Sequence, residues 1–243
     1  MKRILLTTVA LGGLALGSPA LGADLPMYRK APVAPPVYDW SGFYVGGFGG
    51  YAFGNHNLVF PPGPNNGFAN FDLNWESHGA FGGGEAGYNW QSGNLVFGIE
   101  ADSAGGNING NDNNIANPPA AIDANKLKWV ASLRARGGIT VDRLMLFFDG
   151  GWATGDITHT NTNPGVGVDT FTVHRNGLAA GGGLAYAITD NLIGKVEYRY
   201  YDLGTYNHPA PTNGVAAYNV SNTYSTVLLG LDYKFGGPVA AKY

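Results

Sequence analysis

The sequence has 243 residues, of which only 13% are Asp, Glu, Lys or Arg, whereas 39 residues are glycine and 13% are aromatic. A soluble globular domain usually carries about a quarter of charged residues, so this chain has too few charges to cover a surface that faces water on all sides. The formal net charge of −3 provides no basic field for phosphates, which argues against general nucleic-acid binding. The absence of cysteine excludes a disulfide framework and thiolate metal sites.

The first 22 residues have the pattern of an export signal. Lys2 and Arg3 form a positively charged start, residues 4–16 form a short apolar run, and residues 20–22 (Ala-Leu-Gly) match a small-x-small cleavage site. The apolar run is too short to cross about 30 Å of hydrocarbon as a helix, so we expect cleavage rather than a retained anchor. No later segment approaches about 20 consecutive apolar residues. A mature chain that spans a membrane therefore has to do so as a closed β-barrel.

Residues 23–39 are rich in proline and show no hydrophobic periodicity, which is typical of an extended linker. From Trp40 to Phe235 the sequence divides into alternating segments of about 9 to 11 residues, the length that a tilted strand needs to cross a bilayer. We therefore expect a signal peptide over residues 1–22, a periplasmic linker over 23–39, an outer-membrane β-barrel over 40–235 and a C-terminal tail over 236–243.

The alternation of side chains is clearest between residues 127 and 141. One face of this segment carries Leu127, Trp129, Ala131, Leu133, Ala135, Ile139 and Val141, and the other carries Lys128, Ser132, Arg134, Arg136 and Thr140. A period of two residues is a strand pattern and fits no helix. Residues 95–102, 192–201 and 226–235 repeat the pattern, and it is weaker in the glycine-rich segments 42–53, 80–91, 144–153 and 178–187. These eight segments make an even number of strands, as single-chain bacterial barrels require.

The connections between the predicted strands alternate in length. Residues 91–94, 142–143 and 189–191 are tight turn sequences, whereas the stretches 54–79, 103–126, 154–177 and 202–223 are long and rich in Asn, Gly, Pro and Asp. The sequence thus predicts an all-β fold, an eight-stranded antiparallel transmembrane β-barrel with short periplasmic turns and four long outer loops. The alternative is a soluble sandwich or lipocalin-like barrel with its apolar face inward, but the polar face has too few ionic groups to hydrate an exterior and suits a narrow lumen.

The inward-facing charges of these strands include both signs. Buried charges need opposite partners to offset desolvation, so we expect a structural salt-bridge network rather than a catalytic pair. A tight network plugs the lumen, whereas a hydrated one conducts small ions weakly. We expect the constriction where Arg134 and Arg136 oppose Glu100 and Glu197. The predicted lumen network comprises Glu85, Glu100, Arg134, Arg136, Asp149, Lys195, Glu197, Arg199, Asp232 and Lys234, and Asp102 also falls on the inward face.

All five histidines fall in predicted outer loops or at a strand rim. Imidazoles clustered on loops are candidate ligands for a transition metal, and His56, His159 and His208 are the residues that we single out. Their spacing matches no ligand motif, so we expect no bound metal or cofactor. No Ser/His/Asp arrangement identifies a nucleophile beside a base, so we also expect no enzymatic activity.

Several blocks of the sequence are similar to one known family. The blocks are Ala23-Asp24-Leu25-Pro26 and residues 38–47 (YDWSGFYVGG), 87–91 (GYNWQ), 97–102 (FGIEAD), 195–204 (KVEYRYYDLG) and 230–235 (GLDYKF). Together they resemble the Omp25/Omp31 family of alphaproteobacterial outer-membrane proteins over nearly the whole mature chain. The resemblance implies an abundant, porin-like structural surface protein that contributes to envelope integrity. It also implies the eight-stranded transmembrane domain of the OmpA group, without a folded peptidoglycan-binding domain.

The resemblance also implies partners. Outer-membrane lipid and lipopolysaccharide would surround the barrel, and the barrel-assembly machinery would read a C-terminal aromatic residue, either Phe235 or Tyr243. Attachment to peptidoglycan through the amine of Ala23 is a further hypothesis, since the linker would give that amine reach. The alternative functions are a small diffusion porin and a surface protein that binds haem or metal.

Overall fold

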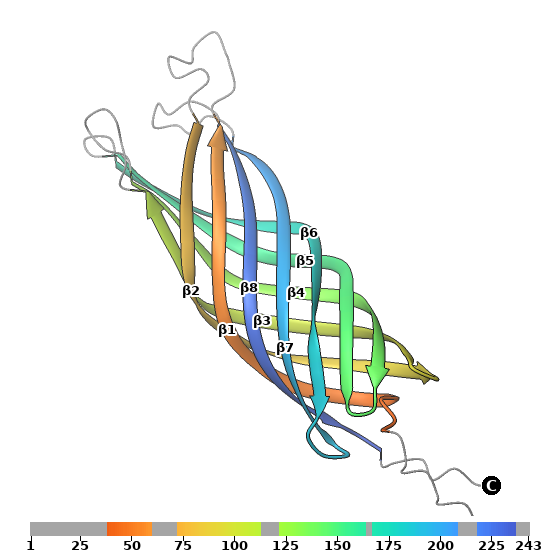
Figure 1. The fold of residues 1–243 in the computed structure, drawn as a ribbon. Helices are drawn as coiled ribbons and strands as arrows, with labels where there is room; N and C mark the ends of the chain where they lie inside the picture. Colours follow the sequence, from red (N-terminus) through yellow and green to blue (C-terminus); the bar gives the residue numbers. More distant parts are fainter. Residues whose placement is uncertain (1–37, 60–71, 113–121, 164–166, 209–217, 237–243) are drawn as a thin grey trace, which may run out of the picture. The chain divides into compact units, whose positions relative to one another are not determined.

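A closed barrel of eight antiparallel strands makes up the described part of the chain, which confirms the predicted fold (Figure 1). The computed structural model describes residues 38–59, 72–112, 122–163, 167–208 and 218–236. The strands are β1 (Gly42–Val59), β2 (Asp72–Ser92), β3 (Leu95–Asp112), β4 (Ile122–Val141), β5 (Leu144–Asn163), β6 (Gly167–Ala187), β7 (Leu192–His208) and β8 (Tyr218–Lys234). Consecutive strands pair with each other, and β1 pairs with β8 to close the sheet. The described residues include no helix that is long and apolar enough to cross a membrane.

The short connections lie at the predicted positions, at the end of the barrel that we call the turn end. Two-residue turns join β2 to β3 and β4 to β5, and residues 188–191 join β6 to β7. Gly93 and Asp142 have φ angles of 62° and 51° in these turns. Such left-handed conformations match the twist of two antiparallel strands joined by a two-residue loop, which explains the choice of Gly and Asp. Short turns mark the periplasmic end of outer-membrane barrels.

The strands are longer than the sequence predicts. They run for 17 to 21 residues instead of about 9 to 11. Most of each predicted outer loop is therefore strand, and the predicted extents of those loops are wrong. The connections that remain, 60–71, 113–121, 164–166 and 209–217, lie outside the described residues.

A belt of exposed apolar side chains surrounds the barrel next to the turn end. On β5 this belt reaches from Leu144 to Trp152; on β6 it reaches from Leu178 to the end of the strand and includes Ile188, the residue that follows β6. About 11 residues of a strand tilted by roughly 45° rise about 25 Å, which is the height of the apolar band of outer-membrane barrels. The predicted orientation, with apolar side chains toward lipid and ionic ones toward the lumen, describes this belt.

The alternation reverses in the half of the barrel beyond the belt. On β5, Ile157 is buried in the lumen, whereas Asp156 and Thr158 face outward. On β8, Val220 is buried while Ser221 faces outward. Polar outward residues resemble loop composition, which is why the sequence predicts loops here. We call this part the outer extension; it consists of residues 54–59, 72–79, 103–112, 122–130, 154–163, 167–177, 202–208 and 218–225.

A β-bulge in β4 turns Lys128 outward. The register between β4 and β5 shifts between Leu127 and Trp129. Leu127 therefore points into the lumen with 5% of its surface exposed, whereas Lys128 is exposed. Simple alternation predicts the opposite orientation of these two residues and is wrong here, because a bulge adds one residue to the strand and inverts the parity beyond it.

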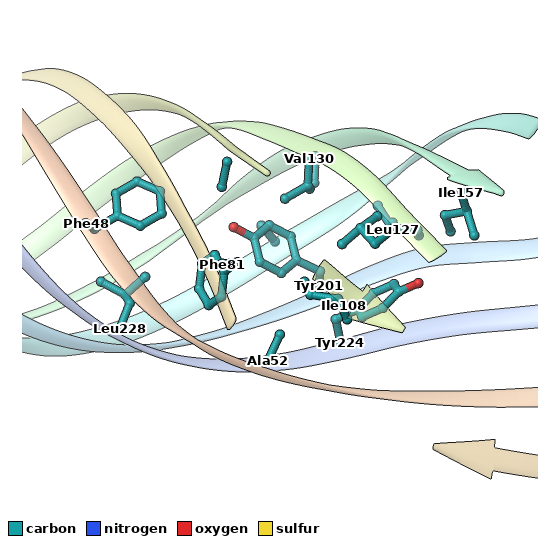
Figure 2. Packing of buried hydrophobic residues seen from close by; sticks show 14 residues of the cluster. Phe48, Ala52, Phe81, Ile108, Leu127, Val130, Ile157, Tyr201, Tyr224 and Leu228 are labelled. Carbon is teal, nitrogen blue, oxygen red and sulfur yellow. The ribbon is translucent and has the colours of Figure 1, made fainter. Parts of the chain in front are cut away.

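The lumen is filled by side chains in layers. Toward the outer end, the described strands contribute an upper apolar layer, part of which Figure 2 shows. Its members are Phe48, Ala52, Phe81, Ala104, Ile108, Leu127, Val130, Ala153, Ile157, Ala179, Tyr201, Leu203, Tyr224 and Leu228. Toward the turn end lies a lower apolar layer of Tyr38, Trp40, Val96, Met145, Phe147, Ala185, Ala187 and Ile193. The charged residues lie on the strand segments between these two layers.

Candidate functional site

A charged layer separates the two apolar layers and is the candidate functional site. Alternation along five strands, β2, β3, β4, β5 and β7, directs its side chains inward, where they are at most 3% exposed. The layer contains Glu85, Glu100, Asp102, Arg134, Arg136, Asp149, Lys195, Glu197 and Arg199. Charges of both signs in contact lower the cost of removing each from water.

Arg134 is the most connected cation of this layer. Its guanidinium lies 2.8 Å from Asp102 (Nη1 to Oδ1), 3.1 Å from Asp149 (Nε to Oδ1) and 3.7 Å from Glu197 (Nη2 to Oε1), and it also pairs with Glu100. These carboxylates belong to β3, β5 and β7, so the side chain crosses the lumen. A planar guanidinium with five N–H donors is suited to hold several carboxylates at once.

Two cations of β7 complete the layer from the other side. Arg199 Nη1 lies 3.3 Å from Asp102 Oδ2, and Arg199 Nε lies 2.7 Å from Glu197 Oε1. Lys195 Nζ lies 2.7 Å from Glu85 Oε2 and 3.3 Å from Glu197 Oε2. Every carboxylate of the layer thus has a cation within reach.

The structure forms some of the contacts of the predicted constriction and not others. Arg134 meets both Glu100 and Glu197, as the alternation predicts. Arg136, however, pairs with Glu100 at 2.7 Å and with Asp149 at 3.5 Å, rather than with Glu197. The reason is register, since Arg136 lies directly opposite Asp149 on the neighbouring strand.

The last two predicted network residues, Asp232 and Lys234, are buried on β8. Asp232 lies beside Glu85 of the charged layer, whereas Lys234 lies apart from it. Lys234 Nζ donates a hydrogen bond to the backbone carbonyl of Asp39 and lies 4.4 Å from the ring centroid of Tyr38. This lysine therefore belongs to the mouth of the turn end. Its position follows from residues 38 and 39, which the sequence predicts only as linker.

Two tyrosine hydroxyl groups belong to the charged layer but are not among the residues that the sequence predicts for it. Tyr44 Oη donates to Glu100 Oε2 at 2.8 Å and accepts from Arg136 at 3.0 Å. Tyr201 Oη accepts from Arg199 Nη1 at 3.0 Å. The signal for Tyr201 is present in the sequence, because it continues the odd-numbered inward face of residues 195, 197 and 199. Glycine-rich β1 provides no comparable signal for Tyr44.

The charged layer offers one group of carboxylates for a metal ion. Oxygens of Glu100, Asp149 and Glu197 lie within 4.8 Å of one another. Each of these side chains also pairs with Arg134, whose guanidinium supplies the positive charge that a metal would bring. The geometry therefore fits an arginine rather than a metal ion.

The histidines lie on strands and not in surface loops, which corrects the prediction. His56 and His159 face the lumen of the outer extension with 2% and 5% of their surface exposed. His56 Nδ1 and Nε2 hydrogen-bond Asn222 and Ser77 at 2.8 and 2.9 Å, so neither nitrogen is free for a ligand. His208 is the last residue of β7. His56 and His159 are buried because their strands continue beyond the belt, so these two side chains offer no surface haem or metal site.

Residues that precede β1 close the mouth of the turn end. Trp40 is completely buried; its backbone N–H donates to Gln91 Oε1 at 2.7 Å and its indole N–H to the Asp142 carbonyl at 3.3 Å. Tyr38 Oη donates to the Asp190 carbonyl at 3.3 Å. Burial raises the pKa of Tyr38 to about 12, so its hydroxyl keeps the donor proton at neutral pH. The two aromatic residues thus contact all three turns.

A closed antiparallel barrel with an apolar belt, short turns and an internal charged layer defines a transmembrane β-barrel of a bacterial outer membrane. The chain belongs to the outer membrane protein β-barrel domain family, whose model matches residues 27–235, and within it to the Omp25/Omp31 relatives that its sequence blocks resemble. It is an outer-membrane surface protein.

Two relatives support this membership, and one solved structure shares the fold. The 31 kDa outer-membrane immunogenic protein of Brucella melitensis biotype 1 is 33% identical, covering 97% of this chain and 100% of the relative. The 25 kDa outer-membrane immunogenic protein of Brucella abortus biovar 1 is 29% identical, covering 97% and 99%. The crystal structure of the outer membrane protein OprG from Pseudomonas aeruginosa matches 81% of this chain and 97% of its own with a TM-score of 0.52 and 13% identity, which supports the fold alone.

Proposed function

We propose that this outer-membrane protein is a structural component of the envelope whose barrel is sealed, rather than a diffusion porin. The observation that supports the proposal is the complete burial of Arg134 and Arg199 in ion pairs that cross the lumen. The upper and lower apolar layers cover this charged layer on both sides. Ions that pass would have to displace both apolar layers and separate the pairs between them.

Energetic considerations favour the sealed state. Removing one partner of a buried ion pair costs about 3–5 kcal/mol, because the other charge stays buried without compensation. Arg134 alone holds several carboxylates, so opening the layer would uncover more than one charge at once. A cavity between the lower apolar layer and the charged layer measures about 10 Å³, which is room for one water molecule.

A structural role also agrees better with the site than an enzymatic one. General acid–base catalysis requires a carboxyl group within hydrogen-bond reach of its substrate. The side chains of Glu100, Asp149 and Glu197 are fully buried and paired with arginine, so a substrate has no access to them in this state. The same pairing explains the layer as a stabilising feature of the barrel.

Recording in planar lipid bilayers tests the sealed barrel. The full mature chain should give no reproducible conductance steps. Arg134→Ala, which opens the charged layer, should produce small steps, whereas the lipid-facing neighbour Leu133→Ala should stay silent. Gel migration of unheated against boiled samples verifies that each variant is folded. Regular steps from the wild-type protein would show a pore and contradict the proposal.

Attachment to peptidoglycan through Ala23 is a second proposed function. The chain enters the barrel at the turn end, where Tyr38 and Trp40 are held by the turns. The stretch from residue 23 to residue 38 spans up to about 50 Å when extended, which gives the amine reach into the periplasm. Mass spectrometry of digested sacculi should detect a muropeptide linked to Ala23. Sacculi that retain no such peptide, although the barrel is abundant in the membrane fraction, would reject the tether.

A further inference from the structure

A small basic patch lies on the outer wall of the barrel, away from the charged layer. It consists of Lys126, Lys128, Trp129 and His174, on β4 and β6. Among the described residues of the outer extension, Lys126 and Lys128 are the lysines that are exposed on the outer wall. Acidic residues face outward elsewhere, with Glu76 on β2 and Asp202 on β7. The two exposed lysines of the outer extension thus lie on one sector of the wall.

The β-bulge of β4 creates this patch. In a regular strand, adjacent side chains point to opposite faces. Because of the bulge at Lys128, the side chains of both Lys128 and Trp129 emerge on the outer wall. Bulges re-aim side chains and are frequent next to functional sites. Here the bulge places an ammonium group next to an indole.

Hydrogen bonds hold the patch in place. Asp156 accepts from the indole N–H of Trp129 at 2.9 Å and bonds His174 Nδ1 at 2.8 Å. The bond to His174 is the main reason that the pKa of Asp156, a partly exposed group of the outer extension, lies below its usual value. Lys128 Nζ donates to Thr172 Oγ1 at 3.3 Å. The patch is therefore organised before any partner binds.

The depth of the patch coincides with the upper edge of the belt. The outward residues of β5 change from Trp152 to Thr154, and those of β6 from Leu178 to Asn176, beside the patch. Trp side chains are enriched where hydrocarbon meets the polar headgroups. Trp129 occupies that boundary, and the two lysines lie just above it. This is the level of the headgroups in the outer leaflet.

We infer that the basic patch binds the phosphorylated headgroup of an outer-leaflet glycolipid of the lipid A type. Lysine ammonium groups bind phosphate, and two of them outnumber the single charge of Asp156. The acyl chains of such a lipid would lie on the belt directly below the patch. This inference rests on the outer-membrane position of the barrel and is independent of the sealed lumen, so either proposal can fail alone.

Native mass spectrometry of the full mature chain in detergent, with phosphorylated or dephosphorylated lipid A, tests the inference. The wild-type protein should retain the phosphorylated lipid preferentially. Each lysine near a charged lipid surface contributes a factor of about five, so K126Q/K128Q should lower retention about 25-fold. Retention of the dephosphorylated lipid should not change. R143Q is the matched control, because it removes an exposed positive charge at the turn end.

A competition with inorganic phosphate and a variant of Asp156 test the inference further. Excess inorganic phosphate should not displace the lipid, since free phosphate lacks the acyl chains that lie on the belt. Asp156→Asn should increase retention, because it removes the negative charge from the patch. Equal retention of both lipids by the wild-type chain, an unchanged preference in K126Q/K128Q, displacement by phosphate alone or a loss of binding in Asp156→Asn would each overturn the inference.

Discussion

The belt and the outer extension are two regions of one continuous sheet. Apolar side chains face outward in the belt and inward in the outer extension. In the belt, β5 directs Phe148 outward and Asp149 inward; some residues later, the same strand directs Asp156 outward and Ile157 inward. The pairing of β5 with β6 keeps one register across the change. What changes is the solvent outside, from hydrocarbon to water. Alternation therefore identifies a strand. Whether the apolar side chains face outward or inward depends on whether lipid or water surrounds that part of the strand.

The largest effect is expected from removing the main cation of the belt region. Arg134→Ala should reduce the free energy of unfolding by about 3–5 kcal/mol, because its carboxylate partners stay buried. Lys128→Ala in the outer extension should change it by less than about 1 kcal/mol, since that side chain is exposed. Urea unfolding in lipid vesicles measures both. Similar losses for the two variants would mean that the charged layer does not stabilise the barrel.

A charge placed on the outer wall should separate the two regions directly. Leu231→Arg, within the belt on β8, should cost about 2–4 kcal/mol because an arginine then faces hydrocarbon. Ser221→Arg faces outward on the same strand in the outer extension and should stay within about 0.5 kcal/mol of the wild type. The same unfolding experiment applies. Equal costs at both positions would refute the boundary between belt and extension.

A smaller, pH-dependent effect should come from the buried polar residues of the outer extension. Burial lowers the pKa of His56, which lies above the belt, to about 4. The unfolded chain binds a proton near pH 6.5, whereas the folded chain does so only near pH 4. Stability due to His56 is therefore complete above pH 6.5 and lost as the pH falls to 4, by at most about 3 kcal/mol.

The matched variant for this pH dependence is His56→Gln, which cannot titrate. The difference in unfolding free energy between wild type and variant should narrow as the pH is lowered through that window. Carboxylates of the charged layer titrate in both proteins and cancel in the difference. A difference that stays constant with pH would show that His56 titrates alike in the folded and unfolded chains.

The strands and turns of the belt can be predicted from the sequence, because apolar and polar residues alternate regularly there. Residues 192–201 alternate without interruption, and the tight turns carry Gly93 and Asp142 where left-handed conformations are needed. The inward position of the charges follows from the same rule. Their individual partners do not, since the contact of Arg136 with Asp149 depends on strand register.

The outer extension was missed for a physical reason. A water-exposed strand with polar outward residues such as Thr158 and Thr160 has a composition similar to that of a loop. Polarity alone therefore does not distinguish such a strand from a loop. The bulge at Lys128 has no local signature, because the shift depends on the pairing with β5. The inward Leu127 and the buried His56 follow from these two features, so sequence reasoning placed them on the wrong side.

The aromatic pair at the turn-end mouth affects how the barrel carries mechanical load. Trp40 and Tyr38 are attached to residues of three different hairpins through Gln91, Asp142 and Asp190. A pull that arrives from the preceding chain is therefore shared among these hairpins before it reaches β1. Rupture would require several hydrogen bonds to break together rather than one after another. Force applied through the preceding chain would therefore load these three hairpins before it loads the seam between β1 and β8.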